Sequence, residues 1–320
     1  MEKLLKGDKF RNRYRITGLL KTLSPLHIGT GVDTDAVYSQ AERERLQRQS
    51  KEKDKAKGKD KVPMVSTVMK DFQGRPLIPG STLRGVLRHW LLSVLSGFGS
   101  QWADYRERYD SGDLAKLDQD GQIEAVKGFS WLELLFGTPF HEGKVEVWDA
   151  ACRTDQTLQA PDTLLSWKPQ SLTYIDTSVA IDPTTGTALE NLLYKTEVVP
   201  PGVEFELTLA GQNLTDFELG LVLLGLQGFN SQIYPIQVGA RGGRGYGRMC
   251  FTPGPVYKLD ADGAKAWVAG IISSLGQAGG ETSLDGAAGY FTLPELSPEE
   301  QQALIKQAKE QLQSQLGSQT

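Results

Sequence analysis

The chain has few of the residues that cross-link a fold or hold a metal. It contains two cysteines, Cys152 and Cys250, which form no Cys-x-x-Cys pair, so no disulfide framework is expected. Its three histidines, His27, His89 and His141, lie far apart in the sequence, which gives a zinc site little support. We therefore expect no structural metal, and the scarcity of cysteine is typical of a reducing cytoplasm.

Long apolar runs are also missing. No segment reaches the roughly 18 apolar residues needed to cross a bilayer, and Met1–Lys6 lacks the apolar centre of a signal peptide. We expect a cytoplasmic protein with no membrane partner. The 320 residues, of which 39% are hydrophobic, are enough for one large domain or two ordinary ones with a sizeable core.

The chain has no strong global charge. Its net charge of −4 argues against a nonspecific polyanion binder, since such proteins are usually basic. Residues 41–62 nevertheless hold nine Lys or Arg and five Asp or Glu and cannot bury an apolar face. We expect a flexible, solvated insertion there, and a basic arm that becomes ordered on RNA is the alternative. Any contact with nucleic acid must therefore come from local patches.

Glycine and arginine are concentrated in residues 239–248, which we name the glycine–arginine loop. Glycine lets the backbone turn through positive φ and approach another chain closely. Arginine forks onto phosphate oxygens, and tyrosine offers a face on which a base can stack. The loop therefore predicts contact with a nucleic-acid backbone, and a mobile surface loop is the alternative. Its candidate RNA-binding residues are Gly239, Arg241, Gly242, Gly243, Arg244, Gly245, Tyr246 and Arg248.

The clearest helix signal begins at Ser81. Apolar residues recur over positions 83–95 with the i, i+3, i+4, i+7 spacing of one helix face. Ser81 or Thr82 is expected to cap this helix, and Arg84 and Arg88 lie one turn apart on its other face. A capped helix start beside arginine is a ready anion site, and ordinary surface arginines are the alternative.

The remaining pattern predicts an α+β fold. Thr215 and Glu218 form a capping box before an apolar helix. Strands are expected near residues 14–20, 144–148, 203–210 and 248–252, and short helices near 129–136 and 219–226. This order suits a ferredoxin-like, RRM-like β-α-β-β-α-β core, a sheet type that recurs among RNA-recognition proteins.

The same pattern predicts how the chain divides into domains. We expect a core domain over residues 1–254, with insertions at about 36–62 and 97–130, and a C-terminal extension over 255–320. Ser297-Pro298-Glu299-Glu300 marks the start of a terminal helix, because it combines a cap, a proline at the first position and an early glutamate. This helix could pack on the body of the protein or on a neighbouring subunit.

Four motifs occur together along the chain. In order they are Leu26-His27-Ile28-Gly29-Thr30-Gly31, Pro76-Leu77-Ile78-Pro79-Gly80-Ser81-Thr82-Leu83-Arg84-Gly85, Leu135-Phe136-Gly137 with Asp149-Ala150, and Gly242-Gly243-Arg244-Gly245-Tyr246-Gly247. With these motifs, from about residue 12 to 253, the chain resembles the RAMP superfamily, the backbone subunits of type III CRISPR effector complexes. Its insertions resemble those of type III-D-like systems.

The resemblance implies an RNA-guided scaffold in antiviral defence. Its partners would be CRISPR RNA, target RNA and other type III effector subunits, and RNA binding would need no cofactor. The residues Ser81, Thr82, Arg84 and Arg88 would lie near the guide phosphates, together with the glycine–arginine loop.

A thumb hairpin is also implied by the resemblance. Residues about 170–200 would form it, with Ile181 and Asp182 beside the turn Thr184-Thr185-Gly186. Such a thumb inserts between guide and target, kinks the duplex and splays out one target nucleotide.

Members of this family often cleave target RNA with an aspartate on the loop after the first strand, usually with a divalent metal. In this chain Val65 or Ser66 occupies the place of that aspartate, and neither binds a metal strongly. Asp33 and Asp35 come earlier on the same loop, but a long insertion separates them from the register. We expect a non-catalytic subunit. A target-RNA endonuclease that uses Asp33 or Asp35 with Mg²⁺ is the alternative.

Two other functions stay open at this point. A guide-processing ribonuclease would use His27 or His89 as acid or base, although His27 is expected to be a structural histidine at a strand end. A protein-only scaffold would leave the glycine–arginine loop without a ligand.

Overall fold

The computed structural model describes residues 3, 5–35, 43–44, 64–99, 101–103, 116–138, 141–155, 158, 164, 166–265, 268 and 294–316. Helices and sheets are mixed within these residues, so the expected α+β class is confirmed. The expected insertion at 36–62 lies almost wholly outside them, as do residues 104–115 of the second expected insertion. None of the helices in the described ranges combines the length and the apolar character that crossing a bilayer requires.

The larger sheet has five strands, and all neighbouring strands in it are antiparallel. In spatial order they are β13 (Glu295–Leu296), β12 (Met249–Asp260), β1 (Asn12–Thr22), β11 (Glu204–Gln212) and β7 (Val145–Val147). Tyr14, Ile16 and Leu20 of β1 are buried, as the alternating pattern predicts for one face of a strand. β12 passes through residues 254 and 255, so the expected junction between the two domains falls within a strand.

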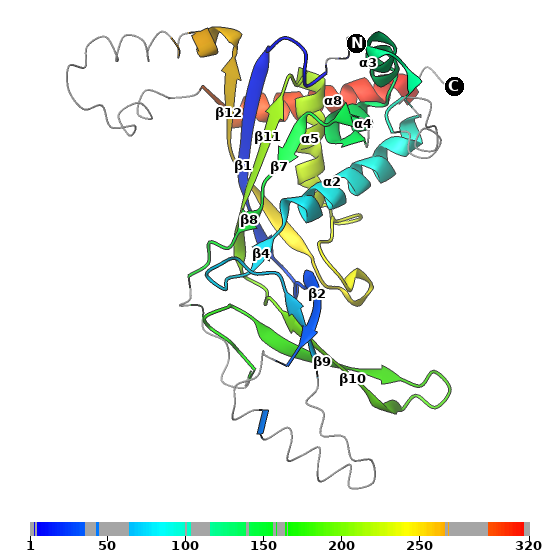
Figure 1. Ribbon diagram of the computed structural model, residues 1–320, viewed down its shortest axis with the longest axis vertical. Helices are drawn as coiled ribbons and strands as arrows, with labels where there is room; N and C mark the ends of the chain where they lie inside the picture. Colours follow the sequence, from blue (N-terminus) through cyan, green and yellow to red (C-terminus); the bar gives the residue numbers. More distant parts are fainter. Residues whose placement is uncertain are drawn as a thin grey trace, which may run out of the picture.

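A second sheet contains the predicted hairpin. Its strands are, in spatial order, β2 (Gly29–Thr34), β3 (Val65–Val68), β10 (Ala188–Val198) and β9 (Tyr174–Ile181). β9 and β10 are antiparallel and form what we name the thumb hairpin, which extends away from the five-stranded sheet in Figure 1. The turn of this hairpin is stabilised by a contact between near neighbours in the sequence. The Asp182 carboxylate accepts a hydrogen bond from the backbone N–H of Thr184 at 2.7 Å.

The helices lie on one face of the five-stranded sheet (Figure 1). They are α2 (Gly80–Leu95), α3 (Gln119–Lys127), α4 (Trp131–Phe136), α5 (Asp216–Gln227) and α8 (Pro298–Leu316). Short 3₁₀ turns occur at Ser96–Phe98, Gly228–Asn230 and Gly242–Arg244. Two small ladders pair β4 (Leu77–Ile78) with β8 (Ala150–Ala151) and β5 (Gly137–Thr138) with β6 (His141–Glu142).

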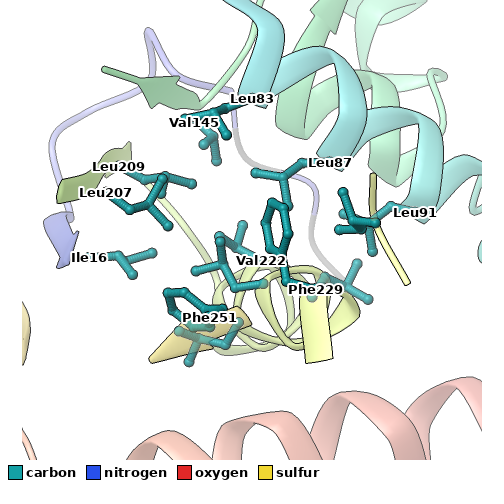
Figure 2. Close-up of a cluster of buried hydrophobic side chains, with 14 of the residues drawn as sticks. Ile16, Leu83, Leu87, Leu91, Val145, Leu207, Leu209, Val222, Phe229 and Phe251 are labelled. Atoms are coloured by element: carbon teal, nitrogen blue, oxygen red, sulfur yellow. The ribbon is translucent and has the colours of Figure 1, made fainter. Parts of the chain in front are cut away.

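The main core lies between this helical layer and the sheet. The leucines of α2 that recur every fourth residue are buried. They are Leu83, Leu87, Leu91 and Leu95. Leu83, Leu87 and Leu91 point into the cluster that also holds side chains of β11 and α5 (Figure 2). Burial of each such side chain contributes roughly 1.5–3 kcal/mol. The periodicity of this helix is therefore confirmed, and the same apolar face fixes its position on the sheet.

The expected second insertion contributes to this core. Trp102 is 2% exposed, and its ring lies 5.3 Å from that of Phe217 on α5. The backbone N–H of Leu132 donates to the carbonyl of Trp102, which joins this segment to α4. Residues 101–103 therefore belong to the packed body, although the sequence around them is polar and irregular.

The C-terminal helix packs on the body. Ser297 and Glu300 exchange capping hydrogen bonds at the start of α8, as the sequence predicts. Ile305, Ala308 and Leu312 are buried, and Gly220 of α5 lets the two helices approach closely. A Cβ atom at Gly220 would lie 2.5 Å from the carbonyl oxygen of Leu304. The apolar stripe of α8 is therefore covered by α5.

Candidate nucleic-acid interface

The glycine–arginine loop is fixed at both ends to residues 25–27, the segment that follows β1. The backbone N–H of Ala240 donates to the His27 carbonyl at 2.9 Å, and that of Gly247 donates to the Pro25 carbonyl at 2.8 Å. The N–H of Val238 donates to the Gly247 carbonyl at 2.9 Å and closes the loop. These bonds hold the ends of the loop in place, which argues against the mobile alternative.

Two glycines make this close approach sterically accessible. Gly239 has φ 81° and Gly247 has φ 76°, a region that other residues rarely adopt. A Cβ atom would lie 2.3 Å from the His27 carbonyl oxygen at Gly239, and 2.0 Å from the Val238 carbonyl oxygen at Gly247. The glycines thus serve the path of the backbone, as the sequence predicts.

The three arginines of the loop are positive charges without an ion pair among the residues that the structure describes. Within the described part of the chain, neither Arg241, Arg244 nor Arg248 lies within ion-pair distance of a carboxylate. Arg244 and Arg248 are exposed, while Arg241 is half-buried in the left-handed region with φ 65°. Its buried Nη1 atom has no hydrogen-bond partner. Three unpaired guanidinium groups on one loop can bind phosphate oxygens.

Tyr246 is engaged in a way that the sequence did not predict. Its hydroxyl donates a hydrogen bond to the carboxylate of Asp176 on β9. Burial, and then this hydrogen bond, raise the pKa of Tyr246 to about 12. The polar end of the side chain therefore contacts the thumb hairpin, and only the ring face is left for the predicted base stacking.

The start of α2 differs from the expected cap. Neither Ser81 nor Thr82 caps the helix; Pro79 holds the N-cap position and makes no side-chain cap bond. The carboxylate of Asp149, between β7 and β8, instead accepts a hydrogen bond from the N–H of Gly80 at 2.7 Å. The predicted cap was wrong, because a carboxylate from another element caps the helix end in place of Ser81 or Thr82.

Arg84 and Arg88 still lie one turn apart on α2. The Arg84 guanidinium donates a hydrogen bond to the carbonyl of Phe136 at the end of α4. Burial, and then the neighbouring Arg88, lower the pKa of Arg84. Arg84 therefore already has a main-chain partner within the protein.

The helix and the glycine–arginine loop are connected through two flanking segments. The Trp90 indole N–H on α2 donates to the Tyr234 carbonyl at 2.9 Å, and the two rings stack with their centroids 6.4 Å apart. On the other side, the N–H of Met69, on the approach to α2, donates to the Ile28 carbonyl at 2.8 Å. Ile28 is adjacent to His27, to which the loop is bonded. Residues 25–28, which we name the support, therefore bond both the loop and the segment that leads into α2.

A buried glutamate, Glu197, joins the support to the residues around it by hydrogen bonds. Glu197 of β10 is 1% exposed and accepts hydrogen bonds from Lys70 Nζ at 2.6 Å, Thr173 Oγ1 at 2.8 Å and the N–H of Val68 at 3.2 Å. The Glu197 carbonyl bonds His27 Nδ1 at 2.8 Å. Sequence reasoning missed this centre, because Glu197 follows Lys195 and Thr196 and nothing in this polar stretch marks its carboxylate as buried.

His27 has the structural role that the sequence predicts. It is 5% exposed, and its Nδ1 atom is held by the Glu197 carbonyl. Burial and the positive charge of Arg241 lower the pKa of His27, so the ring is neutral at pH 7. His89, the other histidine weighed above, is exposed on α2.

The two candidate catalytic aspartates lie at the edge strand of the second sheet. Asp33 of β2 is paired with Ser66 of β3, and Asp35 directly follows β2. The expectation that the insertion separates Asp33 from this register was wrong, because antiparallel pairing brings β2 and β3 together across it. Among the described residues, no three His, Cys, Asp or Glu side chains are grouped as a metal site.

The thumb hairpin presents exposed apolar side chains. Val179 is 46%, Ile181 62% and Tyr194 47% exposed. Asp182, in contrast, is used in the turn, where hydrogen bonds from Thr184 and then from Thr185 lower its pKa. Ile181 is therefore available for a ligand, while the carboxylate of Asp182 stabilises the hairpin.

These features can be compared with known proteins. The model of the RAMP superfamily matches residues 19–250, which include the end of β1, the start of α2, the thumb hairpin and the glycine–arginine loop. No curated protein sequence matches the chain. The family in general is associated with type III CRISPR effector complexes that bind CRISPR RNA. Because the match covers most of the chain, this protein belongs to the RAMP superfamily.

Proposed function

We propose that this protein is a CRISPR RNA-binding backbone subunit of a type III effector complex. The observation that carries the proposal is the glycine–arginine loop, where three guanidinium groups that make no ion pair with a described residue lie on a backbone fixed to residues 25–27. Such a loop binds the phosphates of a strand without reading its sequence. The overall charge of −4 does not oppose this, because the positive charge is local.

The core is proposed to be ferredoxin-like. Its elements follow one another as β1, α2, β7, β11, α5 and β12, which is a β-α-β-β-α-β order. The four strands are neighbours in the sheet as β12, β1, β11 and β7. We also propose the type III-D-like assignment, which rests on the expected insertions alone.

The thumb hairpin is proposed to enter the guide–target duplex. Its support is the set of apolar side chains that β9 and β10 present to solvent. Apolar wedges can separate neighbouring bases and kink a duplex at a cost of a few kcal/mol per step. Target RNA and other effector subunits are accordingly the proposed further partners.

Retention of single-stranded RNA by the purified chain tests this function. The triple variant Arg241→Ala, Arg244→Ala, Arg248→Ala should bind RNA more weakly, and the slope of log affinity against log salt should fall by about 0.7 per lost contact. A matched variant with Arg15, Lys21 and Arg153 changed to Ala removes the same charge from exposed positions on and beside the five-stranded sheet. Equal weakening in both variants would contradict a specific role of the loop.

A second candidate function is cleavage of target RNA. It is favoured by the pairing of Asp33 with Ser66, because Ser66 is one of the two residues at the place of the family's aspartate. Asp33 and Asp35 would hold Mg²⁺, since one or two carboxylates together with phosphate oxygens are its usual ligands. The metal would supply positive charge at the reacting phosphate.

Cleavage assays on the assembled complex separate the two functions. If Asp33 carries catalysis, Asp33→Ala should abolish Mg²⁺-dependent cutting of target RNA and leave guide binding unchanged. Asp35→Ala is the neighbouring comparison. If both variants cut target RNA as the wild type does, cleavage by Asp33 or Asp35 is excluded and RNA binding is the function that remains.

A further inference from the structure

Both strands of the thumb hairpin are hydrogen-bonded at their base to the glycine–arginine loop or to its support. On β9, Asp176 accepts the hydrogen bond from Tyr246 of the loop. On β10, the Glu197 carbonyl bonds Nδ1 of His27, and the His27 carbonyl accepts the N–H of Ala240 at 2.9 Å. The hairpin is thus connected to the loop by two separate routes.

The two routes meet the hairpin at neighbouring positions. Asp176 is paired with Thr196, and Ile175 with Glu197, so the anchors occupy adjacent rungs of the same ladder. The turn at residues 182–186 lies beyond them at the far end of the hairpin. The ladder is paired from Tyr174 and Val198 at the base to Val179 and Leu193, and it pairs again at Ile181 and Ala188 beyond an irregularity. The orientation of the base therefore sets the direction in which the hairpin leaves the protein.

The two routes differ in how firmly they are held. Glu197 is buried and satisfied by three donors, so the β10 route is part of the packed body. The β9 route depends on one side chain, Tyr246, which lies in the loop itself among the three arginines. A hydrogen bond from a phenol to a carboxylate is charge-assisted and about twice as strong as a neutral one.

We propose that Tyr246 is a positioning residue that couples occupation of the glycine–arginine loop to the orientation of the thumb hairpin. This inference rests on the proposed function, because it takes RNA as the ligand of the loop. An RNA strand that orders the loop would fix Tyr246, and Tyr246 would then hold β9 through Asp176. The hydroxyl thus acts on the thumb hairpin, while the ring face stays available for the base stacking predicted from the sequence.

The contact is tested first without RNA, by hydrogen exchange of the intact chain. In Tyr246→Phe, amides of β9 should exchange faster by roughly tenfold or more, the factor that corresponds to loss of one charge-assisted hydrogen bond. Tyr174→Phe removes another hydroxyl at the base of β9, where burial, and then the charge of the nearby Asp176, raise the pKa of Tyr174. Exchange in this control should stay unchanged.

Amides of β1 and β11 report whether the variants remain folded, and they should exchange as in the wild type. Asp176→Asn keeps an acceptor but removes its charge, so β9 should show an intermediate increase. If Tyr246→Phe leaves β9 exchange unchanged, the hydroxyl does not hold the hairpin and the proposal is overturned.

The coupling is tested by adding single-stranded RNA without a target strand. In the wild type, RNA should slow exchange in the loop and also in β9. In Tyr246→Phe, the loop should still be protected while the added protection of β9 is lost. A change in fold stability alone would not remove only the RNA-dependent part. Protection of β9 that persists in the variant would mean that RNA reaches the hairpin directly, which contradicts the coupling.

The outcomes also separate this inference from the function on which it rests. If RNA protects neither segment of the wild type, RNA binding by the loop fails, and with it the coupling to RNA. The RNA-free comparison of Tyr246→Phe with Tyr174→Phe still decides whether Tyr246 positions the hairpin.

Discussion

Nζ of Lys144 lies 2.6 Å from Oε1 of Glu218, and both side chains are fully buried. Lys144 directly precedes β7, and Glu218 lies in the first turn of α5, where its Oε2 atom also accepts the N–H of Thr215 at 2.9 Å. Burial lowers the pKa of Lys144 even though Glu218 acts in the opposite direction. The pair thus joins the edge of the five-stranded sheet to α5 inside the protein.

Removal of one partner should be costly. Lys144→Met should lower the free energy of unfolding by about 3–5 kcal/mol, because it leaves a buried carboxylate without its counterion. Lys144→Met combined with Glu218→Gln should recover most of this loss, since glutamine keeps the capping bond and carries no charge. Urea denaturation measures both. Equal losses in the single and double variants would show that the unpaired charge is not the cause.

The loop glycines should differ sharply in their tolerance of alanine. Gly247→Ala should cost about 1–3 kcal/mol and weaken RNA retention, because it puts a side chain at φ 76° against the Val238 carbonyl. Gly243→Ala is the control, because a Cβ atom at this position would have no neighbour within 4 Å. Its change in stability should stay within about 0.5 kcal/mol. Urea denaturation and RNA retention measured on both variants check the prediction.

The cap of α2 gives a direct comparison of two side chains. Asp149→Ala should lower the free energy of unfolding by about 1 kcal/mol, because it removes the acceptor of the Gly80 N–H. Ser81→Ala should have almost no effect, because Ser81 makes no cap bond. Thermal or urea unfolding of both variants decides the matter. If Ser81→Ala lowered the free energy of unfolding more than Asp149→Ala does, Ser81 would be the cap, as expected from the sequence.

The stability of the protein should fall as the pH drops below about 7. The pKa of His27 is lowered by burial and by Arg241, so the unfolded chain takes up a proton near pH 6.5 while the folded protein does not. The free energy of unfolding should therefore decrease as pH falls through 6.5 toward the folded pKa. His27→Asn keeps a donor for the Glu197 carbonyl and cannot titrate, so part of this slope should vanish.

The contribution of His141 to the pH dependence of stability must be tested together with that of His27. Burial, and then Lys144, lower the pKa of His141 as well, so it contributes to the slope with the same sign. Urea denaturation at pH 7.5 and 5.5 for His27→Asn, His141→Asn and the double variant separates the two. A slope that survives in the double variant would exclude both histidines as its cause.

Features that depend on neighbours in the chain could be predicted from the sequence. Thr215 and Glu218 are three residues apart, so their capping box forms wherever the helix forms, and the structure confirms it. The leucine spacing of α2 and the turn at Asp182 have the same local character. The glycines of residues 239–248 also predicted a close backbone approach, which the structure shows at Gly239 and Gly247, where a Cβ atom would collide with a carbonyl oxygen.

Contacts between residues far apart in the sequence were decided only by the tertiary structure. Asp149 and Gly80 are 69 residues apart, and Tyr246 and Asp176 are 70 apart, so no periodicity signals either hydrogen bond. Asp33 meets Ser66 only because β2 and β3 pair across the insertion. The sequence by itself determined which helices, turns and loop conformations are favourable, since those energies are local. The packing of sheet against helices determined which distant polar groups meet, and so which side chains serve the loop and the thumb hairpin.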